Sequence, residues 1–503
     1  MTRDLSKFTQ RTFDLLVVGG GIMGAGIAWD AAHRGLSCAL AEQGDFASGT
    51  SSKTTKLIHG GIRYLENFDF ALVRQSIRER KTLLSLAPDL VHPLPFIIPV
   101  KGNSPRPWPM IRLGMALYDF LAGSARIQRS AFLQKEQISE EEPLLAQAGV
   151  QRAALYYDAQ MDDARLVLEV LQAAAQAGAV AANYVQVKRW KTEAGRITGA
   201  KLEDRLTGKI FSVTARVVLN ATGPWADRLR HLADPSLRPI VRPSKGIHLI
   251  YPDMGLKHAL LLSSPQDGRI FFLIPWKNMT LIGTTDTDCN DDPAEVRAEE
   301  SEVDYLIKGV NRLLPQLRLE RAGIIAAFAG VRPLVAQEKK DPWAVSRSHL
   351  IHEDPNGLVS VVGGKFTTFR ATAQEVVDDL SRRFPEKRLK PCTTGQSPFS
   401  QQVLRAETMK RWISTDPRMA DLLCPHHPFI KADVRYAVER EMAMNLGDIL
   451  WRRLGIGWSA CRGLDALQAT AEVAGNCLGW GPAEIQRQME RYRSEVVMNR
   501  LQK

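Results

Sequence analysis

The sequence predicts an α/β protein in three parts: a parallel-sheet domain assembled from distant segments, a mixed-sheet domain interleaved with it, and an all-helical C-terminal domain. Continuous apolar, β-branched runs at 13–18, 217–220 and 358–362 indicate parallel strands that are covered on both faces. Apolar and polar residues alternate over 240–285, which indicates an antiparallel sheet. Residues 400–503 keep a helical periodicity with few β-branched runs, so we expect helices there.

A glycine-rich turn directly follows the first of these strands. Its glycines are spaced as Gly19-x-Gly21-x-x-Gly24, a small apolar helix comes next, and Glu42 ends a second short strand. In such a unit the first glycine permits the tight turn, the second lets the backbone approach a pyrophosphate, and the third allows helix and strand to pack closely. The helix N-terminus offers N–H groups to the phosphates, and Glu42 is placed to accept hydrogen bonds from a ribose 2′-hydroxyl. The unit predicts a Rossmann-like dinucleotide site and leaves NAD and FAD both open.

Three further stretches extend this site to distant parts of the chain. Residues 44–63 form a loop rich in Ser, Thr and Gly that ends in His-Gly-Gly, which suits wrapping around a bulky cofactor; a solvated loop is the alternative. Ala-Thr-Gly at 221–223 ends one buried strand, and Gly-Gly at 363–364 joins another strand to a helix. Small residues at the carboxyl ends of strands line the ligand crevice of open α/β folds. A site spread this widely favours FAD over NAD.

The charge balance and the cysteines limit the partners. The 503 residues carry 66 Lys and Arg against 55 Asp and Glu, a formal net charge of +11. This excess suits a phosphorylated small molecule, an anionic membrane surface or nucleic acid, with a basic surface that has no specific partner as the alternative. No recognition-helix, zinc or RNP-type pattern occurs, so we expect no nucleic-acid partner. The six cysteines lack metal-ligand spacing, which predicts no metal site and a reducing compartment.

Residues 108–123 predict a helix that is apolar almost throughout. It is too short to span a membrane, and Lys101, Arg106, Arg126 and Arg129 flank it. This combination fits a helix that lies in the headgroup region of an anionic membrane. A buried helix of a cap domain fits the residues as well, and both interpretations stay open.

Taken in order, these stretches resemble the FAD-dependent, membrane-associated glycerol-3-phosphate dehydrogenase family nearly from end to end. The similar stretches are GGGIMGAG (19–26), TSSKTTKLIHGGIRYLE (50–66), MDDARLVLE (161–169), VVLNATGPW (217–225), SKGIHLI (244–250), IGTTDTD (282–288), GVRPL (330–334) and GGKFTTFR (363–370). Two departures are small. Met23 stands where relatives often have asparagine, and Thr54-Thr55 stands where small residues are usual. Neither is expected to touch the chemistry.

The resemblance implies oxidation of sn-glycerol 3-phosphate at its C2 hydroxyl to dihydroxyacetone phosphate, with FAD as hydride acceptor and a membrane quinone as the final acceptor. It also implies a peripheral protein at an anionic membrane surface, on the cytoplasmic face of the inner (cytoplasmic) membrane, and leaves a homodimer open. The expected domains are a core at 1–390, with FAD-binding segments at about 12–90, 150–230 and 320–385 and substrate-binding cap segments at about 91–149 and 231–319, and a helical domain at 391–503.

The substrate implied by the resemblance carries a phosphate dianion, which needs fixed donors. Arginine suits it because a guanidinium pairs with two phosphate oxygens at once. Arg63, Arg332 and Arg347 match the family positions, with Tyr64 and Lys365 nearby, and these are the predicted substrate-binding residues.

Hydride loss from a carbinol is assisted by a base that accepts the hydroxyl proton, and histidine has a suitable pKa. A single histidine in a β segment is more often structural, but the resemblance makes His248 the candidate base. Lys365 or Arg332 could instead stabilise the developing alkoxide, so the predicted catalytic residues are these three. The predicted FAD-binding residues belong to the glycine-rich turns and the loop between them: Gly19, Gly21, Gly24, Glu42, Thr50, Ser51, Ser52, Lys56, Leu57, His59, Gly60, Gly61, Val187, Ala221, Thr222, Gly223, Gly330, Gly364, Lys365, Phe366, Thr367 and Thr368.

Two other enzyme activities compete with this reading. A glycerophosphate oxidase would pass electrons to oxygen, whereas the apolar, cation-flanked segment 108–123 favours a quinone, which lives in the bilayer. A flavin-dependent amine oxidase shares the predicted architecture but would not need three arginines.

Overall fold

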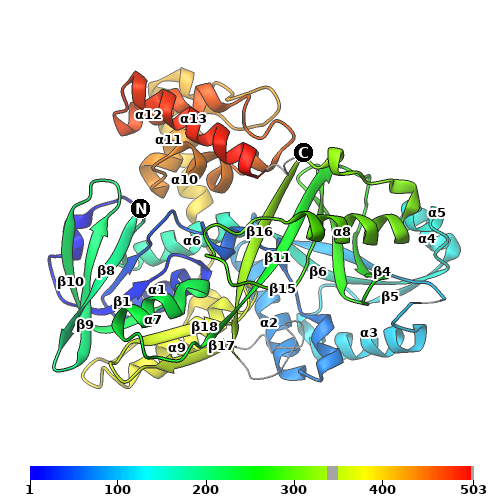
Figure 1. Ribbon diagram of the computed structural model, residues 1–503, viewed down its shortest axis with the longest axis horizontal. Helices are drawn as coiled ribbons and strands as arrows, with labels where there is room; N and C mark the ends of the chain where they lie inside the picture. The colour runs from blue at the N-terminus through cyan, green and yellow to red at the C-terminus, as the bar shows by residue number, and fades with distance from the viewer. Residues whose placement is uncertain (103, 337–348, 500–503) are drawn as a thin grey trace.

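The computed structural model describes residues 1–102, 104–336 and 349–499. Two sheets lie side by side, and a helical domain covers one side of them (Figure 1). The predicted α/β class with an interleaved second sheet and a helical C-terminal region is confirmed.

The smaller sheet carries the glycine-rich turns. Its strands run in the order β17 (His349–Glu353), β18 (Val359–Gly363), β10 (Ile210–Asn220), β1 (Phe13–Val18), β2 (Cys38–Ala41) and β7 (Val180–Ala182), and β8 (Val185–Glu193) and β9 (Arg196–Asp204) extend β10 as a meander. β1 is parallel to both β2 and β10, and Val18 lies opposite Ala41 and Asn220. The carboxyl ends of three strands that are distant in sequence therefore meet at one level.

Helices α1 (Ile22–His33), α6 (Asp163–Gln176) and α9 (Phe369–Ser381) pack together over this sheet. α1 is apolar nearly all round because it lies between the sheet and its neighbours. At Gly26 an added Cβ would meet the ring of Phe369 at 2.7 Å, so α1 and α9 are in direct contact.

The larger sheet curls beside the first and holds ten strands. Their order is β15 (Thr287–Asp288), β11 (Val241–Pro252), β14 (Met279–Gly283), β13 (Ile270–Trp276), β12 (Ala259–Ser263), β4 (Val91–Val100), β6 (Arg152–Met161) and β3 (Leu57–Ile58), with β16 (Ala326–Val335) on β11 and β5 (Ala131–Gln134) on β6. Its outer helices are α2 (Phe70–Leu86), α3 (Trp108–Ala122), α4 (Lys135–Glu141), α5 (Pro143–Gln147) and α8 (Glu300–Leu313).

The expected segment boundaries stay a prediction, and strand pairing crosses them. The sequence assigns β3, β6 and β16 to FAD-binding segments, yet all three pair within the larger sheet. The reason is that motifs locate turns and not hydrogen-bond partners. The proline-containing strand β4 occupies an inner position of the sheet, because it pairs with β6 on one side and with β12 on the other. Its prolines occupy alternate positions, 93, 95 and 99, so the missing N–H groups all face one side of the strand.

The C-terminal region is all-helical, as predicted. It comprises α10 (Gln401–Thr415), α11 (Lys431–Glu441), a π-helical turn (Asp448–Arg453), α12 (Leu467–Leu478) and α13 (Pro482–Met498). This domain lies against the smaller sheet and reaches β16 of the larger one, where Ala327 N–H donates to the carbonyl of Asn499 (Figure 1).

We expect Gly24→Ala to lower the free energy of unfolding by about 1–3 kcal/mol, because the added carbon would lie 1.9 Å from the carbonyl oxygen of Gly19. The matched control is Gly114→Ala in α3, where no described atom lies within 4 Å of the added carbon. There the change should raise stability by up to about 1 kcal/mol. Thermal unfolding of both variants checks the difference, and equal stability would contradict the close approach of α1 to the turn.

Candidate active site

One cavity of about 1230 Å³ opens between the two sheets. Sites for small molecules typically measure about 300 to 1000 Å³. The cavity exceeds this range and so has room for a dinucleotide and a second ligand. The predicted site residues that line it are Gly19, Gly21, Glu42, Thr50, Ser51, Leu57, His59, Gly61, Arg63, Tyr64, Val187, Ala221, Thr222, Gly223, His248, Gly330, Arg332, Gly364, Lys365, Phe366 and Thr367. The fold thus brings residues from eight separate stretches into one wall.

The fingerprint end of the cavity is built by close backbone approach. A Cβ at Gly19 would lie 2.5 Å from the carbonyl oxygen of Ala221, so only glycine fits there. The Glu42 carboxylate accepts N–H groups of Gly20 (2.6 Å) and Gly44 (2.7 Å) and so ties the two loops together. Burial raises the pKa of Glu42, although these two bonds act in the opposite direction. Each carboxylate oxygen keeps a second lone pair for a ribose hydroxyl.

The Ser/Thr-rich loop is an ordered wall, so the solvated-loop alternative is wrong. Thr50 Oγ1 donates to the carbonyl of Val331 (2.6 Å), and Ser51 Oγ accepts the N–H of Ile22 (3.0 Å). His59 N–H donates to Thr367 Oγ1 (3.2 Å), which joins the end of the loop to the second glycine-rich junction.

Five predicted cofactor residues lie behind the wall and not in it: Gly24, Ser52, Lys56, Gly60 and Thr368. The Lys56 side chain, 3% exposed, pairs with Asp163 at 2.7 Å and donates to the Ser52 carbonyl. Its ammonium group therefore fixes the loop to α6, and the side chain is not among those that line the cavity, so cofactor binding by Lys56 stays a prediction.

A buried polar cluster behind Gly60 was not predicted. Asp158 accepts the Gly60 N–H and the Tyr118 hydroxyl, both at 2.8 Å, and is ion-paired with Arg80. Burial raises the pKa of Asp158 against the opposing effect of Arg80. Asp158 also lines the cavity. An acidic residue inside the apolar strand LYYDA was the available signal, but the partners of Asp158 lie 40 to 98 positions away in the chain.

His248 lies on β11 and faces the cavity while almost fully buried. Its Nε2 is 3.0 Å from Thr55 Oγ1, and its ring stacks on Phe328 with centroids 4.9 Å apart. Burial, aided by the positive charges of Arg332 and Lys56, holds the pKa of His248 well below its ordinary value, so the imidazole is neutral at pH 7.

The Thr55 contact corrects the sequence-based view of this position. Thr55 departs from the small residue usual in the family and was expected to leave the chemistry untouched. Its hydroxyl instead contacts the candidate base directly and lines the same cavity. The loop position and the histidine are 193 residues apart, so the sequence held no sign of the pairing.

Arg332 lies on β16, opposite Ser244 of β11, the strand that also carries His248. Its guanidinium donates to Thr284 Oγ1 (2.9 Å) and the Thr285 carbonyl (3.2 Å) and is 3.3 Å from Asp286. A Cβ at Gly246 would lie 2.3 Å from Nη2, so the opposite strand leaves space for this side chain. Arg332 is held in place and half-exposed to the cavity.

The remaining predicted substrate residues form a second group. Lys365 Nζ lies 3.6 Å from the Tyr64 ring centroid and 3.3 Å from Ser76 Oγ, and Arg63 lies over the same ring at 5.6 Å. Arg347 lies outside the described residues. Among the described residues, no group of three His, Cys, Asp or Glu side chains is arranged to hold a metal ion.

Comparison with known proteins agrees with this geometry. Residues 14–378 match the family model described as FAD dependent oxidoreductase, and residues 401–485 match the C-terminal domain of alpha-glycerophosphate oxidase. A glycerol-3-phosphate dehydrogenase from Synechocystis sp. is 35% identical over 99% of this chain and 98% of its own. The mitochondrial glycerol-3-phosphate dehydrogenase of Homo sapiens is 34% identical over 95% of this chain and 72% of its own.

A solved glycerol-3-phosphate dehydrogenase from Bacillus halodurans, complexed with FAD, has a TM-score of 0.79 at 28% identity and covers 98% of this chain and 96% of its own. The predicted cofactor FAD is confirmed by these matches, and the glycine turns and the Glu42 loop fit its dinucleotide half. The chain belongs to the FAD-dependent glycerol-3-phosphate dehydrogenase family.

Proposed function

We propose that this enzyme oxidises the C2 hydroxyl of sn-glycerol 3-phosphate to dihydroxyacetone phosphate and passes the electrons to a membrane quinone. The observation that carries the proposal is that one cavity is lined by the glycine-rich turns, by a neutral buried histidine and by fixed cations. The relatives' names support the same substrate.

The cations suit a phosphate dianion. Arg332 presents its guanidinium from a fixed position, while Lys365 and Arg63 both lie close to the ring of Tyr64. A bidentate arginine supplemented by point charges holds a phosphate in one orientation. We therefore assign phosphate binding to Arg332, Lys365 and Arg63, with Tyr64 as their support; Arg347 stays a prediction.

His248 is assigned as the proton acceptor. Its Nδ1 is buried and has no hydrogen-bond partner among the described residues, so Nε2, next to Thr55, is the nitrogen on the cavity side. A neutral ring with its proton on Nδ1 offers the Nε2 lone pair to the C2 hydroxyl proton. Bound FAD supplies the hydride acceptor. Lys365 and Arg332 then stabilise negative charge that develops on the substrate oxygen.

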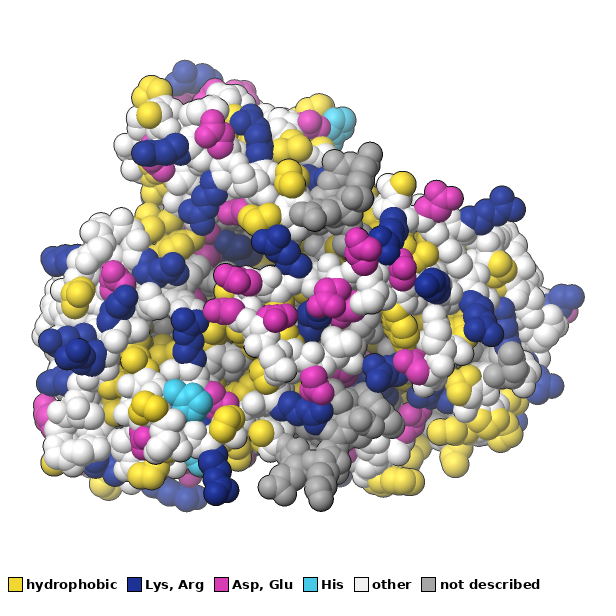
Figure 2. Space-filling view, in the orientation of Figure 1, with side chains coloured by type: hydrophobic (Ala, Val, Ile, Leu, Met, Phe, Trp, Pro, Cys, Tyr) yellow, Lys and Arg dark blue, Asp and Glu magenta, His cyan; other side chains and the backbone are white. Residues whose placement is uncertain are grey.

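The membrane partner is proposed from α3. Ile111, Met115 and Tyr118 are buried, which agrees with a cap helix, but Leu113 and Phe120 on the other face are 71% and 80% exposed. The buried face fits the cap-helix interpretation, and the exposed apolar face supports the proposal of a membrane contact. More exposed apolar side chains lie around it at Phe68, Phe70, Met110 and Phe132, and Figure 2 shows hydrophobic side chains gathered over this region at the lower right.

An apolar face of this kind beside arginines fits a protein that lies on an anionic bilayer, where a quinone is within reach. None of the described helices combines the length and apolarity required to cross a bilayer. We propose peripheral attachment at the cytoplasmic face of the inner membrane. Oxygen as acceptor is the second candidate, since the C-terminal family model takes its description from an oxidase.

We expect His248→Ala to lower kcat by about 100- to 10,000-fold with little change in KM, because the proton acceptor acts in the transition state. Activity requires the neutral ring, so it is present above the pKa of His248 and lost as the pH falls through it. The acid limb of the kcat/KM profile should therefore lie below the ordinary histidine value of 6.5. Near-normal turnover in the variant, with His231→Ala as control, would remove His248 from this role.

We expect Arg332→Met to lower kcat/KM for glycerol 3-phosphate by about 30-fold or more, since losing one partner of a partly buried charge pair costs about 2 kcal/mol or more. The control is Arg321→Met, an exposed arginine paired with Asp304 outside the cavity. Steady-state kinetics decide, and unchanged kinetics at Arg332 would refute its role in binding.

We expect the double variant Leu113→Ser/Phe120→Ser to bind vesicles rich in phosphatidylglycerol about tenfold more weakly, because it removes the apolar area available for insertion. Leu206→Ser/Ile210→Ser, at exposed apolar positions of the β9–β10 hairpin, is the matched control. Cosedimentation measures both. Equal loss in both variants would speak against α3 as the membrane face.

The acceptor is tested by turnover with a short-chain quinone under nitrogen and with oxygen alone. We expect the quinone to give the higher kcat. Faster turnover with oxygen would assign the enzyme to the oxidases.

A further inference from the structure

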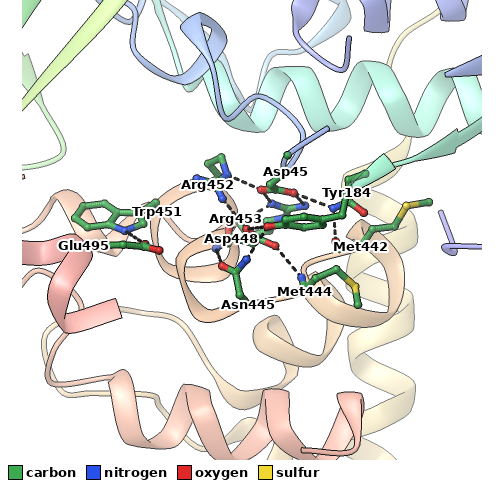
Figure 3. A network of polar contacts seen from close by, with 12 residues as sticks. Asp45, Tyr184, Met442, Met444, Asn445, Asp448, Trp451, Arg452, Arg453 and Glu495 are labelled. Atoms are coloured by element: carbon green, nitrogen blue, oxygen red, sulfur yellow. Dashed lines mark hydrogen bonds and ion pairs between the residues drawn. The ribbon is translucent and has the colours of Figure 1, made fainter. Parts of the chain in front are cut away.

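The loop from Glu42 to Gly49 lines one end of the cavity. The C-terminal helical domain contacts the side of this loop that faces away from the cavity. Asp45, 2% exposed, points away from the cavity and into the domain interface. Arg452 and Arg453, consecutive residues of the π-helical turn, both donate to its carboxylate, and Nη2 of Arg453 does so at 2.8 Å (Figure 3). A one-turn π-helix is rare and often marks a functional position.

The loop from Glu42 to Gly49 links this interface to the cavity. Glu42, Gly44, Ala47 and Ser48 line the cavity, whereas Asp45 faces the helical domain. Ala47 N–H donates to the carbonyl of Gly20 in the fingerprint turn (3.1 Å), and Ser48 N–H donates to the carbonyl of Asp45 (3.1 Å). Any shift of Asp45 therefore moves the cavity wall on both sides of it.

Two acidic and two basic side chains form ion pairs where the helical domain meets the Asp45 loop. Arg452 also donates to Asp448 (2.7 Å), and Asp448 accepts the hydroxyl of Tyr184 (2.8 Å) from the smaller-sheet domain. Two carboxylates thus face two arginines in Figure 3. Burial alone would raise the pKa of Asp45, but Arg453 and Arg452 outweigh it and hold that pKa below its usual range.

Asp45 depends on the helical domain for its charge partners. Its remaining side-chain contact is Asn183 Nδ2 at 3.1 Å, and that amide itself donates to the carbonyl of Met442 in the C-terminal region. A buried carboxylate without its cations is strongly unfavourable. The loop would then rearrange to expose Asp45, and Glu42 and Gly44 would move with it. The field of Arg452 reaches the cavity wall as well, since burial and this arginine lower the pKa of Lys53 to about 8.

We propose that the C-terminal helical domain is a working part of the cofactor site: through Arg452 and Arg453 it holds the Asp45 loop in the conformation that binds the adenosine half of FAD. Asp45, Arg452 and Arg453 are positioning residues and do not touch the cofactor. By thermodynamic linkage, FAD must in turn strengthen docking of the helical domain. The inference rests on the proposed orientation of FAD, with its adenosine end at Glu42, and not on the substrate or acceptor.

The first test measures the FAD and ADP dissociation constants of the apoprotein by fluorescence titration in Asp45→Asn, Arg453→Gln and the double variant. We expect each single change to weaken FAD and ADP by the same factor, about tenfold, as supporting contacts behind ligand-binding groups commonly do. The double variant should lose little more FAD and ADP affinity than either single variant, because the Asp45–Arg453 contact is removed in all three. Arg452→Lys, which keeps the charge, should lose less than Arg452→Gln.

The matched control is Arg435→Gln, which breaks the Arg435–Glu439 pair within α11 of the helical domain without touching the Asp45 loop. It should lower the melting temperature while FAD affinity stays within about twofold. An equal loss of FAD affinity in Arg435→Gln, or a lower melting temperature with unchanged FAD affinity in the Asp45 and Arg453 variants, would overturn the proposal.

A second measurement needs no variant. Backbone hydrogen exchange over 445–453 is compared in the apoprotein and with saturating ADP. We expect slower exchange with ADP, and unchanged exchange would contradict the linkage. If wild-type apoprotein fails to bind ADP, the orientation of FAD is wrong; if ADP binds but glycerol 3-phosphate is not oxidised, only the proposed substrate fails.

Discussion

Parallel pairing of β1 with both β2 and β10 is the constraint on which the site depends. Because Val18 lies opposite Ala41 and Asn220, the three strands end together, and Gly19, Glu42 and Ala221 follow at the same edge. The backbones then come so close that no side chain fits at Gly19. A dinucleotide half-site follows from this register, and the rest of the molecule completes it.

The larger sheet adds to that half-site the side chains to which we assign proton transfer and phosphate binding. Its paired strands β11 and β16 carry His248 and Arg332, with His248 opposite Phe328 and Arg332 opposite Ser244. Gly246 and Gly283 leave the space that these two side chains occupy. The helical domain supports both halves from behind. It holds Asp45 on the dinucleotide side, and Trp458 packs on Phe328, which in turn stacks on His248. Loops of the cavity wall are held by buried ion pairs at Lys56, Asp158 and Asp45. Such pairs contribute little net stability but penalise any other arrangement of the wall.

The elements that depend only on residues close together in the chain could be predicted from the sequence. The strand–turn–helix unit, the helical periodicity beyond residue 400 and the glycine junction at 363–364 follow from burial and backbone freedom within a few residues, and the structure contains all of them. Pairing across the chain could not be read in this way. The membership of β6 and β16, the Thr55 contact to His248, the Arg80–Asp158 pair and the Asp45–Arg453 pair join segments up to 408 residues apart. The two faces of α3 also required the structure, because one apolar sequence serves both a buried and an exposed surface.

The central claim is that substrate and cofactor meet in this cavity, and reduction of the flavin by the substrate tests it most directly. Purified enzyme is mixed anaerobically with sn-glycerol 3-phosphate while the flavin absorption bands are followed. We expect the bands to bleach, with one dihydroxyacetone phosphate formed per flavin reduced, and we expect glycerol, which lacks the phosphate, to leave them unchanged. Bands that persist in saturating glycerol 3-phosphate, or that bleach equally with glycerol, would contradict it.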